Sequence, residues 1–128
     1  MKDFEEWKPG FLDLQERVDI IILGVPGGIA DWVDAEAEQF ILDNVKVPTV
    51  VEHDWMINYG VLAFSKVAEE QGIWAAKTAL DIIDGKNPAE IPVAKNREGK
   101  IALNFKLAEK LGITFGPDIL KNAEVIYE

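Results

Sequence analysis

Two stretches near the end of the chain decide the fold: EQGIWAAKTALDIIDGKNPAEIPVAKN at residues 70–96 and GKIALNFKLAEKLGI at residues 99–113. The first predicts a helix over residues 68–84 that ends at Gly85. One side of this helix carries small and apolar residues, which predict close packing against a sheet or another helix: Gly72, Ala76, Ala79, Leu80 and Ile83. Residues 91–94 and 100–103 predict short strands. Residues 105–111 predict a helix with Gly112 as its C′ residue.

The residues before these stretches alternate between extended and helical patterns. The apolar run DIIILG at residues 19–24 predicts a strand that is buried on both faces, as in a parallel sheet. PTVVE at residues 48–52 predicts the next strand, and residues 61–67 a further extended segment. Between them a helix is predicted from an N-cap at Asp34 to about residue 45.

The N-terminal residues predict a helix with one apolar stripe. Phe4, Trp7, Phe11, Leu14 and Val18 recur at steps of three and four. Pro9 interrupts the stripe and predicts a kink, or a helix that begins at Pro9. Taken together, the elements predict an α/β fold in a single domain over residues 1–128, a three-layer parallel sheet with flanking helices.

Composition excludes several classes of function. The 128 residues carry a net charge of −10 without a basic run, which argues against nucleic acid and anionic membranes as partners. The chain has no cysteine, so disulfides, thiol catalysis and cysteine-bound metals are excluded. The start MKDFEE is acidic where a signal peptide requires a basic and then an apolar stretch, and no secretion signal is expected there.

The loop GVPGGIADW at residues 24–32 is the first candidate site. It follows a predicted buried strand and leads to a helix, the position at which open α/β sheets bind ligands. Gly27 and Gly28 would let a ligand carboxylate approach backbone N–H groups, while Asp31 could accept from an ammonium group. Neither a dinucleotide fingerprint nor a phosphate loop is present. The alternative is a tight turn that uses glycine for its angles, with Trp32 packed as a lid.

The second candidate site is EHDW at residues 52–55, with Tyr59 beyond it. Trp55 and Tyr59 could stack on a flat or cationic group of a ligand. Catalysis by His53 and Asp54 is not supported, because neighbouring residues of an extended segment point to opposite faces and no nucleophile is tied to the histidine. A surface or packing role is the alternative for His53. One histidine and scattered carboxylates show no metal-ligand spacing, and no cofactor is predicted.

The whole chain resembles one family of solute-binding proteins of ABC importers, the branch that includes tryptophan-binding members. The segments that carry the resemblance keep the family's order, and the last is the most specific: residues 7–19, the loop to Asp31-Trp32, residues 48–50, Glu70-Gln71-Gly72, and the ending Asn104…Ala108…Leu111-Gly112. The resemblance implies a type I periplasmic binding fold, in which two α/β lobes close on a small solute. It also implies a non-enzymatic protein outside the cytoplasm, with an ABC permease as partner.

The resemblance places eight residues at the cleft between the lobes: Gly27, Gly28, Asp31, Trp32, His53, Asp54, Trp55 and Tyr59. It also implies that these 128 residues are the C-terminal part of a two-lobed protein, without the N-terminal lobe. A piece of a longer protein, a shortened gene product and a module that completes itself by pairing are all compatible with this expectation.

Two functions are therefore considered. The first is the capture of a small organic solute, such as an amino acid, as part of an importer. The second is a self-associating α/β interaction or sensor module that binds no ligand by itself. A homodimer through the face left by the missing lobe is expected in the second case, because exposed apolar surface favours association.

Overall fold

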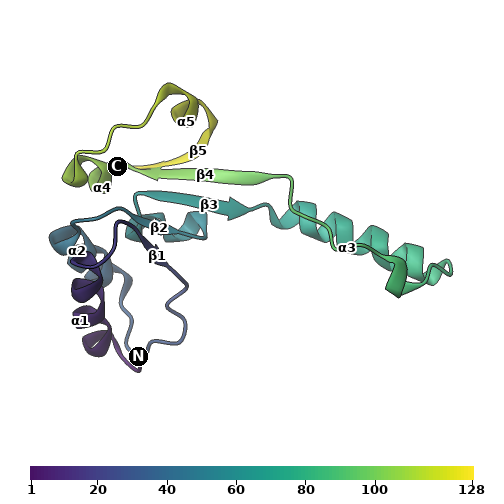
Figure 1. The fold of residues 1–128 in the computed structure, drawn as a ribbon, viewed down its shortest axis with the longest axis horizontal. Coiled ribbons are helices and arrows are strands. Elements are labelled where there is room, and N and C mark those ends of the chain that lie inside the picture. The colour runs from purple at the N-terminus through teal and green to yellow at the C-terminus, as the bar shows by residue number, and fades with distance from the viewer.

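A computed structural model describes residues 1–128 as a five-stranded sheet with helices packed around it (Figure 1). The strands are β1 Ile21–Leu23, β2 Thr49–Val51, β3 Leu62–Lys66, β4 Gly99–Asn104 and β5 Ala123–Tyr127. The helices are α1 Phe4–Gln15, α2 Asp34–Asn44, α3 Ala68–Ile83, α4 Phe105–Leu111 and α5 Pro117–Asn122, with short 3-10 helices η1 Asp54–Tyr59 and η2 Pro88–Glu90. None of the helices is long and apolar enough to cross a membrane.

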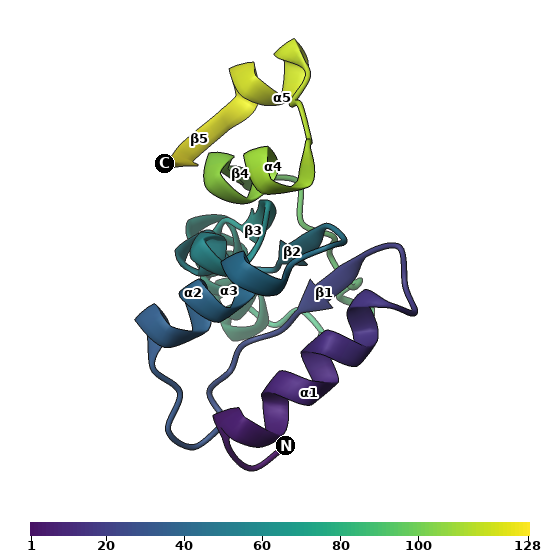
Figure 2. The same cartoon turned by 90° about the vertical axis from the view of Figure 1, so that its left-hand side faces the viewer.

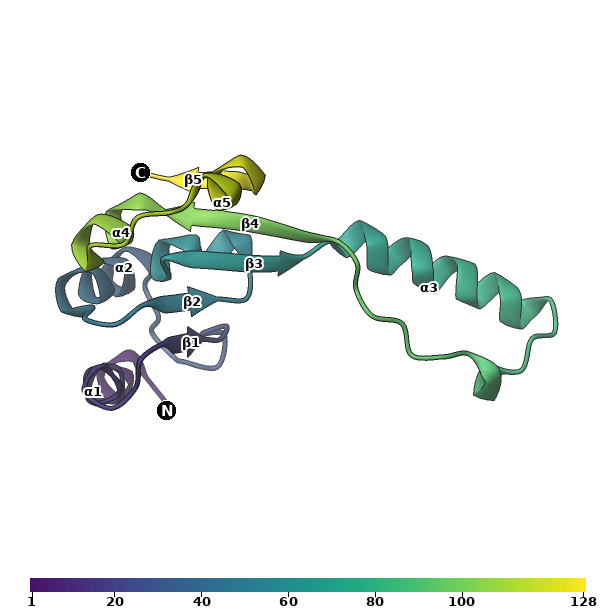
Figure 3. The ribbon, with the colours of Figure 1, turned by 45° about the horizontal axis from the view of Figure 1, so that its top comes forward.

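The strands lie in the order β1-β2-β3-β4-β5. β1, β2 and β3 are parallel to one another, β5 is parallel to β4, and the only antiparallel pair is that of β3 and β4. The antiparallel pair arises because the chain leaves the sheet after β3, passes through α3 and returns at the same edge (Figure 3). The predicted α/β fold with a sheet and flanking helices is confirmed, with the difference that the sheet is mostly and not wholly parallel.

One face of the sheet carries the hydrophobic core. Apolar side chains from α1, α2, α4 and η1 pack there against β1 to β4, and Ile41 and Met56 are fully buried. In α1 the predicted stripe is confirmed for Phe4, Trp7 and Phe11, which are buried. Pro9 lies inside this helix, which begins at Phe4 because the Asp3 carboxylate caps the N–H of Glu6. The expected start at Pro9 is therefore wrong.

The opposite face of the sheet carries a row of apolar side chains. Backbone pairing aligns one residue from each strand on this face: Ile22, Val50, Leu62, Leu103 and Ile126. Leu103 is buried, but Ile22 is 69% exposed and Ile126 is 50% exposed. Phe64, two residues after Leu62 on the same face, is 62% exposed. The prediction that residues 19–24 are buried on both faces is wrong, because helices cover this strand on one side only.

α3 and the segment that returns from it form an arm that projects from the sheet (Figures 1 and 3). The helix has no buried residue, so the predicted close packing of its small-residue side is wrong within this chain. Gly85, at φ +102°, reverses the chain direction after the helix, as expected. Residues 91–94 do not form the predicted strand, because no neighbouring strand pairs with them.

Strand β4 and helix α4 agree with their predictions. α4 spans the predicted residues, and Gly112 ends it with a left-handed φ of +66°. α5 then leads to β5, which adds the last strand beside β4. Seen from the end of the sheet, β5 and α5 lie at the opposite extremity from α1 (Figure 2).

Candidate functional site

The two predicted site segments leave the sheet at the same edge. Leu23, the last residue of β1, pairs with Val51, the last residue of β2. Gly24 and Glu52 therefore follow neighbouring parallel strands at their carboxyl ends, where open α/β sheets bind ligands. We call the loop of residues 24–31 together with residues 52–55 the strand-end edge.

The glycines of the loop lie at the two central positions of a hydrogen-bonded β-turn. The Ile29 N–H donates to the Pro26 carbonyl at 2.8 Å, with Gly27 and Gly28 between them. Neither glycine has a positive φ. A Cβ added to Gly28 would meet no atom within 4 Å, and one added to Gly27 would touch only Val25 at 3.8 Å. The interpretation that the turn needs glycine for its angles is therefore wrong at these two positions, and both glycines face open space.

Asp31 anchors the end of this loop to the start of α1. Its carboxylate accepts a hydrogen bond from the Phe4 N–H at 2.9 Å, and the neighbouring Ala30 N–H donates to the Lys2 carbonyl at 2.8 Å. Asp31 also has a left-handed φ of +58°, a conformation that aspartate tolerates better than most residues. A negative charge at a helix N-terminus is stabilised by the helix dipole, which accounts for this placement.

Trp32 and Tyr59 meet beside this anchor. The Trp32 indole N–H donates to the Tyr59 hydroxyl at 3.2 Å, and that hydroxyl donates to the Asp34 carboxylate at 2.5 Å. Trp32 packs edge-on against the rings of Phe4 and Tyr59, so the interpretation of Trp32 as a packed lid agrees with the structure. Tyr59 is only 2% exposed.

The Asp34 carboxylate therefore does not serve as the predicted N-cap of α2. Val33 occupies the N-cap position, and Asp34 is the first helical residue. One helical turn later, Glu38 accepts a hydrogen bond from the Tyr127 hydroxyl at 2.8 Å. The sequence analysis missed both tyrosine–carboxylate pairs, because each joins residues that are far apart in the chain. The only sign of these pairs in the sequence is that Asp34 and Glu38 lie four residues apart, on one side of a predicted helix.

Burial and the hydrogen bond to Asp34 raise the pKa of Tyr59 above its usual value of 10.0. Because the folded protein holds this proton more tightly than the unfolded chain does, the associated stabilisation is complete below about pH 10 and is lost as the pH rises through the folded pKa. Tyr127 shows the same direction of pKa shift, mainly through its hydrogen bond to Glu38.

Replacing Tyr59 by Phe is expected to lower the free energy of unfolding by about 1–2 kcal/mol near neutral pH, because Asp34 and Trp32 lose their partner. The loss of stability above about pH 10 should also become less steep. Urea denaturation at neutral and alkaline pH measures both effects. Tyr127→Phe is the matched control, since Tyr127 is a more exposed tyrosine with a single carboxylate partner, and it should cost less at neutral pH. If stability fell as steeply above about pH 10 in Tyr59→Phe as in the native protein, Tyr59 would not be the source of the alkaline loss of stability.

His53 and Trp55 form an aromatic platform at the other side of the strand-end edge. Their rings are stacked with centroids 5.5 Å apart and an interplanar angle of 12°. Trp55 is 62% exposed, which is unusual for so large an apolar side chain. The Asp54 carboxylate accepts a hydrogen bond from the Trp55 N–H at 3.0 Å.

The structure thus divides the eight predicted residues into two groups. Gly27, Gly28 and Trp55 are exposed on the strand-end edge, with His53 and Asp54 half-buried beside Trp55. Trp32 and Tyr59 pack into the protein, and the Asp31 carboxylate is bonded to α1. A ligand role for all eight stays a prediction. No group of three or more histidine, aspartate or glutamate side chains is arranged to hold a metal ion.

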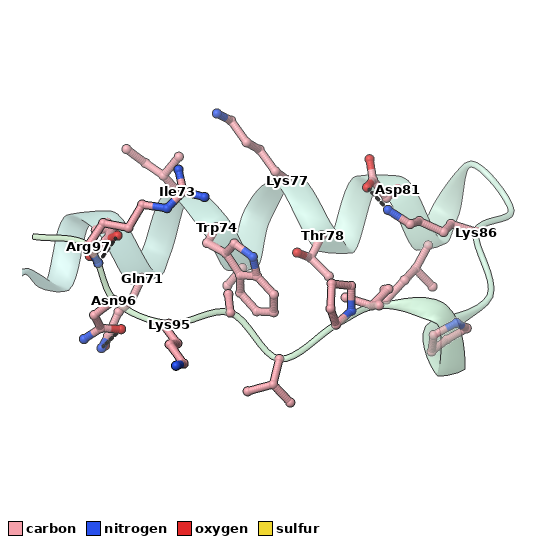
Figure 4. Close-up of a pocket in the computed structure, with 18 of the residues that line it drawn as sticks. Gln71, Ile73, Trp74, Lys77, Thr78, Asp81, Lys86, Lys95, Asn96 and Arg97 are labelled. Atoms are coloured by element: carbon pink, nitrogen blue, oxygen red, sulfur yellow. Dashed lines mark hydrogen bonds and ion pairs between the residues drawn. The ribbon is translucent and has the colours of Figure 1, made fainter.

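A groove that the sequence analysis missed lies along the arm. This groove of about 1420 Å³ runs between α3 and the return segment of residues 91–98. Trp74 and Thr78 point from the helix toward the return segment, whereas Ile73 and Lys77 point away from it (Figure 4). The Glu70 carboxylate holds the base of the groove by accepting from the N–H groups of Arg97 and Glu98. In the sequence, the groove could be recognised from Trp74, Thr78 and Ile82, which recur every four residues and so share one side of the helix.

Open α/β sheets bind ligands at the carboxyl ends of their strands, and here this edge carries an exposed glycine turn and an exposed aromatic platform. The sequence matches the family described as ABC transporter substrate binding protein over residues 13–126. The chain therefore belongs to this family. No protein of curated function matches the sequence significantly.

Solved structures share the fold. The ABC domain from Streptococcus pneumonia, in complex with L-Trp, is 23% identical with a TM-score of 0.60, over 97% of this chain and 43% of that one. A conserved domain protein from Vibrio cholerae O1 biovar El Tor is 20% identical with a TM-score of 0.61, over 97% and 42%. A substrate binding protein with adhesive properties from Clostridium difficile, in a ligand-free, open structure, is 16% identical with a TM-score of 0.65, over 96% and 41%. The chain thus spans less than half the length of these proteins.

Proposed function

We propose that this chain forms one wall of the solute cleft in the binding protein of an ABC importer, and that the solute resembles an amino acid. The observation that carries the proposal is the open turn at Gly27 and Gly28, where local structure requires no glycine. Open space beside a backbone is what a ligand needs to approach it closely. The turn follows a strand that ends beside the segment leading to the exposed Trp55.

The parts of an amino acid fit the chemistry of this edge. Backbone N–H groups of the glycine turn suit the carboxylate, and the platform of His53 and Trp55 suits a flat side chain. The exposed carboxylate of Glu52, at the start of the second segment, suits the ammonium group. The bound L-Trp in the pneumococcal structure of the same fold supports this class of solute.

The remaining parts of the proposal follow from the family. A substrate-binding protein acts outside the cytoplasm, where it captures its solute without chemical change and delivers it to a membrane permease. The two lobes would close over the solute, and the permease would recognise the closed, loaded form of the protein. We propose the same non-catalytic role, partner and location for the protein that carries this chain.

Replacing Gly28 by Ala tests the glycine turn. The folded protein should keep its stability or gain up to about 1 kcal/mol, because the site is open and alanine restricts the unfolded chain. The affinity for an amino acid found in a calorimetric panel of L-amino acids should fall at least about tenfold, because a methyl group would separate backbone and ligand. Gly116→Ala is the matched control, since Gly116 is equally open but lies before α5. If no amino acid of the panel bound, the proposed class of solute would be wrong. If Gly28→Ala bound the amino acid as tightly as the native protein, the glycine turn would not contact the ligand.

A further inference from the structure

The Tyr59 hydroxyl links the two segments of the strand-end edge by hydrogen bonds. Trp32 and Asp34 directly follow the glycine loop, and Tyr59 is the last residue of η1, which begins inside the second segment. Two side-chain hydrogen bonds join residues 24–34 to residues 52–59, one from the Trp32 indole N–H and one to the Asp34 carboxylate. Both use the Tyr59 hydroxyl, and none of the backbone hydrogen bonds outside the helices and strands joins these two segments.

The backbone of Tyr59 lies directly on the sheet. The next residue, Gly60, is so close to β2 that an added Cβ would lie 3.0 Å from the Thr49 carbonyl oxygen. The Val61 N–H donates to the same carbonyl at 2.7 Å. Thr49 and Tyr59 are both buried, with exposed fractions of 0% and 2%. Tyr59 is therefore a fixed point from which its hydroxyl can hold the more exposed segments.

The burial of Tyr59 also separates its ring from the exposed side of the edge. Trp32 packs edge-on against this ring, with the ring centroids 5.5 Å apart, and leaves it no free face on which a ligand could stack. Gly28 and Trp55, in contrast, are exposed in the two segments that the hydroxyl joins. Tyr59 can therefore act on a solute through the residues that it holds in place.

We infer that Tyr59 is a positioning residue of the proposed solute site, whose hydroxyl holds the glycine turn and the aromatic platform at the spacing that one solute bridges. This inference rests on the proposed function and adds to it the residue that sets the distance between the two contacts. Segments that are already held in the bound arrangement lose less conformational freedom on binding, and this raises the affinity. Without the hydroxyl, each segment should keep its fold while their relative position fluctuates.

Calorimetric titration of the protein that carries this chain, with the best amino acid of the panel, measures the effect on affinity. Tyr59→Phe should weaken binding by about five- to tenfold, because the ring stays packed and only the hydrogen bonds are lost. Tyr127→Phe is the matched control, since it removes a similar bond to α2, at Glu38, outside the strand-end edge, and it should stay within about twofold of the native affinity. Circular dichroism establishes that each variant is folded. If Tyr59→Phe bound as tightly as the native protein, the inference would be wrong.

Variants of Asp34 separate positioning from direct contact with the solute, because this exposed carboxylate could also bind an ammonium group. Asp34→Asn removes the charge but keeps an oxygen that accepts from the Tyr59 hydroxyl, and it should stay within about twofold of the native affinity. Asp34→Ala removes the acceptor and should weaken binding as Tyr59→Phe does. Equal losses of affinity in Asp34→Asn and Asp34→Ala would show that the charge acts on the solute, and would overturn the inference.

A double-mutant cycle with Trp55→Ala tests whether the two segments are coupled. In the Trp55→Ala protein, adding Tyr59→Phe should change the affinity by less than about twofold, because no tryptophan is left to be positioned against the glycine turn. If the losses of binding free energy in the two variants were additive, Tyr59 would not act through the aromatic platform.

Amide hydrogen exchange without a solute distinguishes a failure of this inference from a failure of the proposed function. The N–H groups of Ile29 and Met56 each donate to a carbonyl within their own segment. Both should exchange at least about threefold faster in Tyr59→Phe than in the native protein, and at the native rate in Tyr127→Phe. If exchange rose in this way but no amino acid bound, the proposed class of solute would be wrong and the link through Tyr59 would stand. If exchange did not rise in Tyr59→Phe, the positioning role would be wrong whatever solute the protein binds.

Discussion

Replacing Asn104 by Ala is expected to lower the free energy of unfolding by about 2–4 kcal/mol. Asn104 is 1% exposed, and its side chain makes two hydrogen bonds. The amide nitrogen donates to the Ile57 carbonyl at 2.9 Å, and the amide oxygen accepts from the Leu107 N–H at 3.0 Å. Alanine would leave a buried carbonyl and the first turn of α4 without partners. Urea denaturation followed by circular dichroism measures the loss.

Asn87 provides a matched control for this prediction. It also caps a short helix, with its side chain accepting from the Ala89 N–H at 3.1 Å, but it is exposed to solvent. Asn87→Ala should therefore cost less than about 1 kcal/mol, because water replaces the lost bond. Equal losses of unfolding free energy in the two variants would show that the burial of Asn104 does not add to its contribution to stability.

The role of Asn104 explains the most specific part of the family resemblance. It begins the sequence Asn104…Ala108…Leu111-Gly112 that the chain shares with its family. Through Ile57 it also holds η1, whose second residue is Trp55. The motif therefore supports the short helix that carries Trp55.

Replacing Trp55 by Ala is expected to weaken solute binding by about 30-fold, which corresponds to the roughly 2 kcal/mol of a tryptophan that dominates an interface. The reason is that Trp55 offers the largest exposed ring at the strand-end edge, supported from behind by His53. Stability should change little, because the side chain is mostly exposed. Isothermal titration calorimetry with the best amino acid of the panel measures the affinity.

Trp74→Ala is the matched control for Trp55→Ala. Trp74 is 45% exposed but lies on the arm, where it lines the groove. Its replacement should leave the affinity within about twofold of the native value. If Trp55→Ala bound as tightly as the native protein, the aromatic platform would not form part of the cleft.

Local patterns predicted the elements that depend on a few neighbouring residues. Helix α4 has an asparagine cap at one end and a left-handed glycine at the other, and both signals lie within nine residues. The strand after Pro48 was also predicted, because three β-favouring residues follow the proline. The two segments that follow β1 and β2 at the strand-end edge were readable for the same reason.

Predictions failed where the outcome depended on a distant partner. Asp34 has the residue type of an N-cap, but the Tyr59 hydroxyl engages its carboxylate. Residues 91–94 have strand-forming side chains, yet a strand requires a neighbour to pair with, and none is present. The structure also showed that Trp32 and Tyr59 pack together, whereas Trp55 remains exposed.

The sequence by itself determined most of the strands and helices, the family and the two segments at the strand ends. Capping, periodicity and turn chemistry are local properties, so neighbouring residues suffice to read them. Only the tertiary structure decided which apolar surfaces are covered. The same pattern of apolar residues builds the buried core beneath α1 and α2 and the exposed face around Phe64. The difference is whether another element reaches that face, and this depends on contacts between residues far apart in the chain.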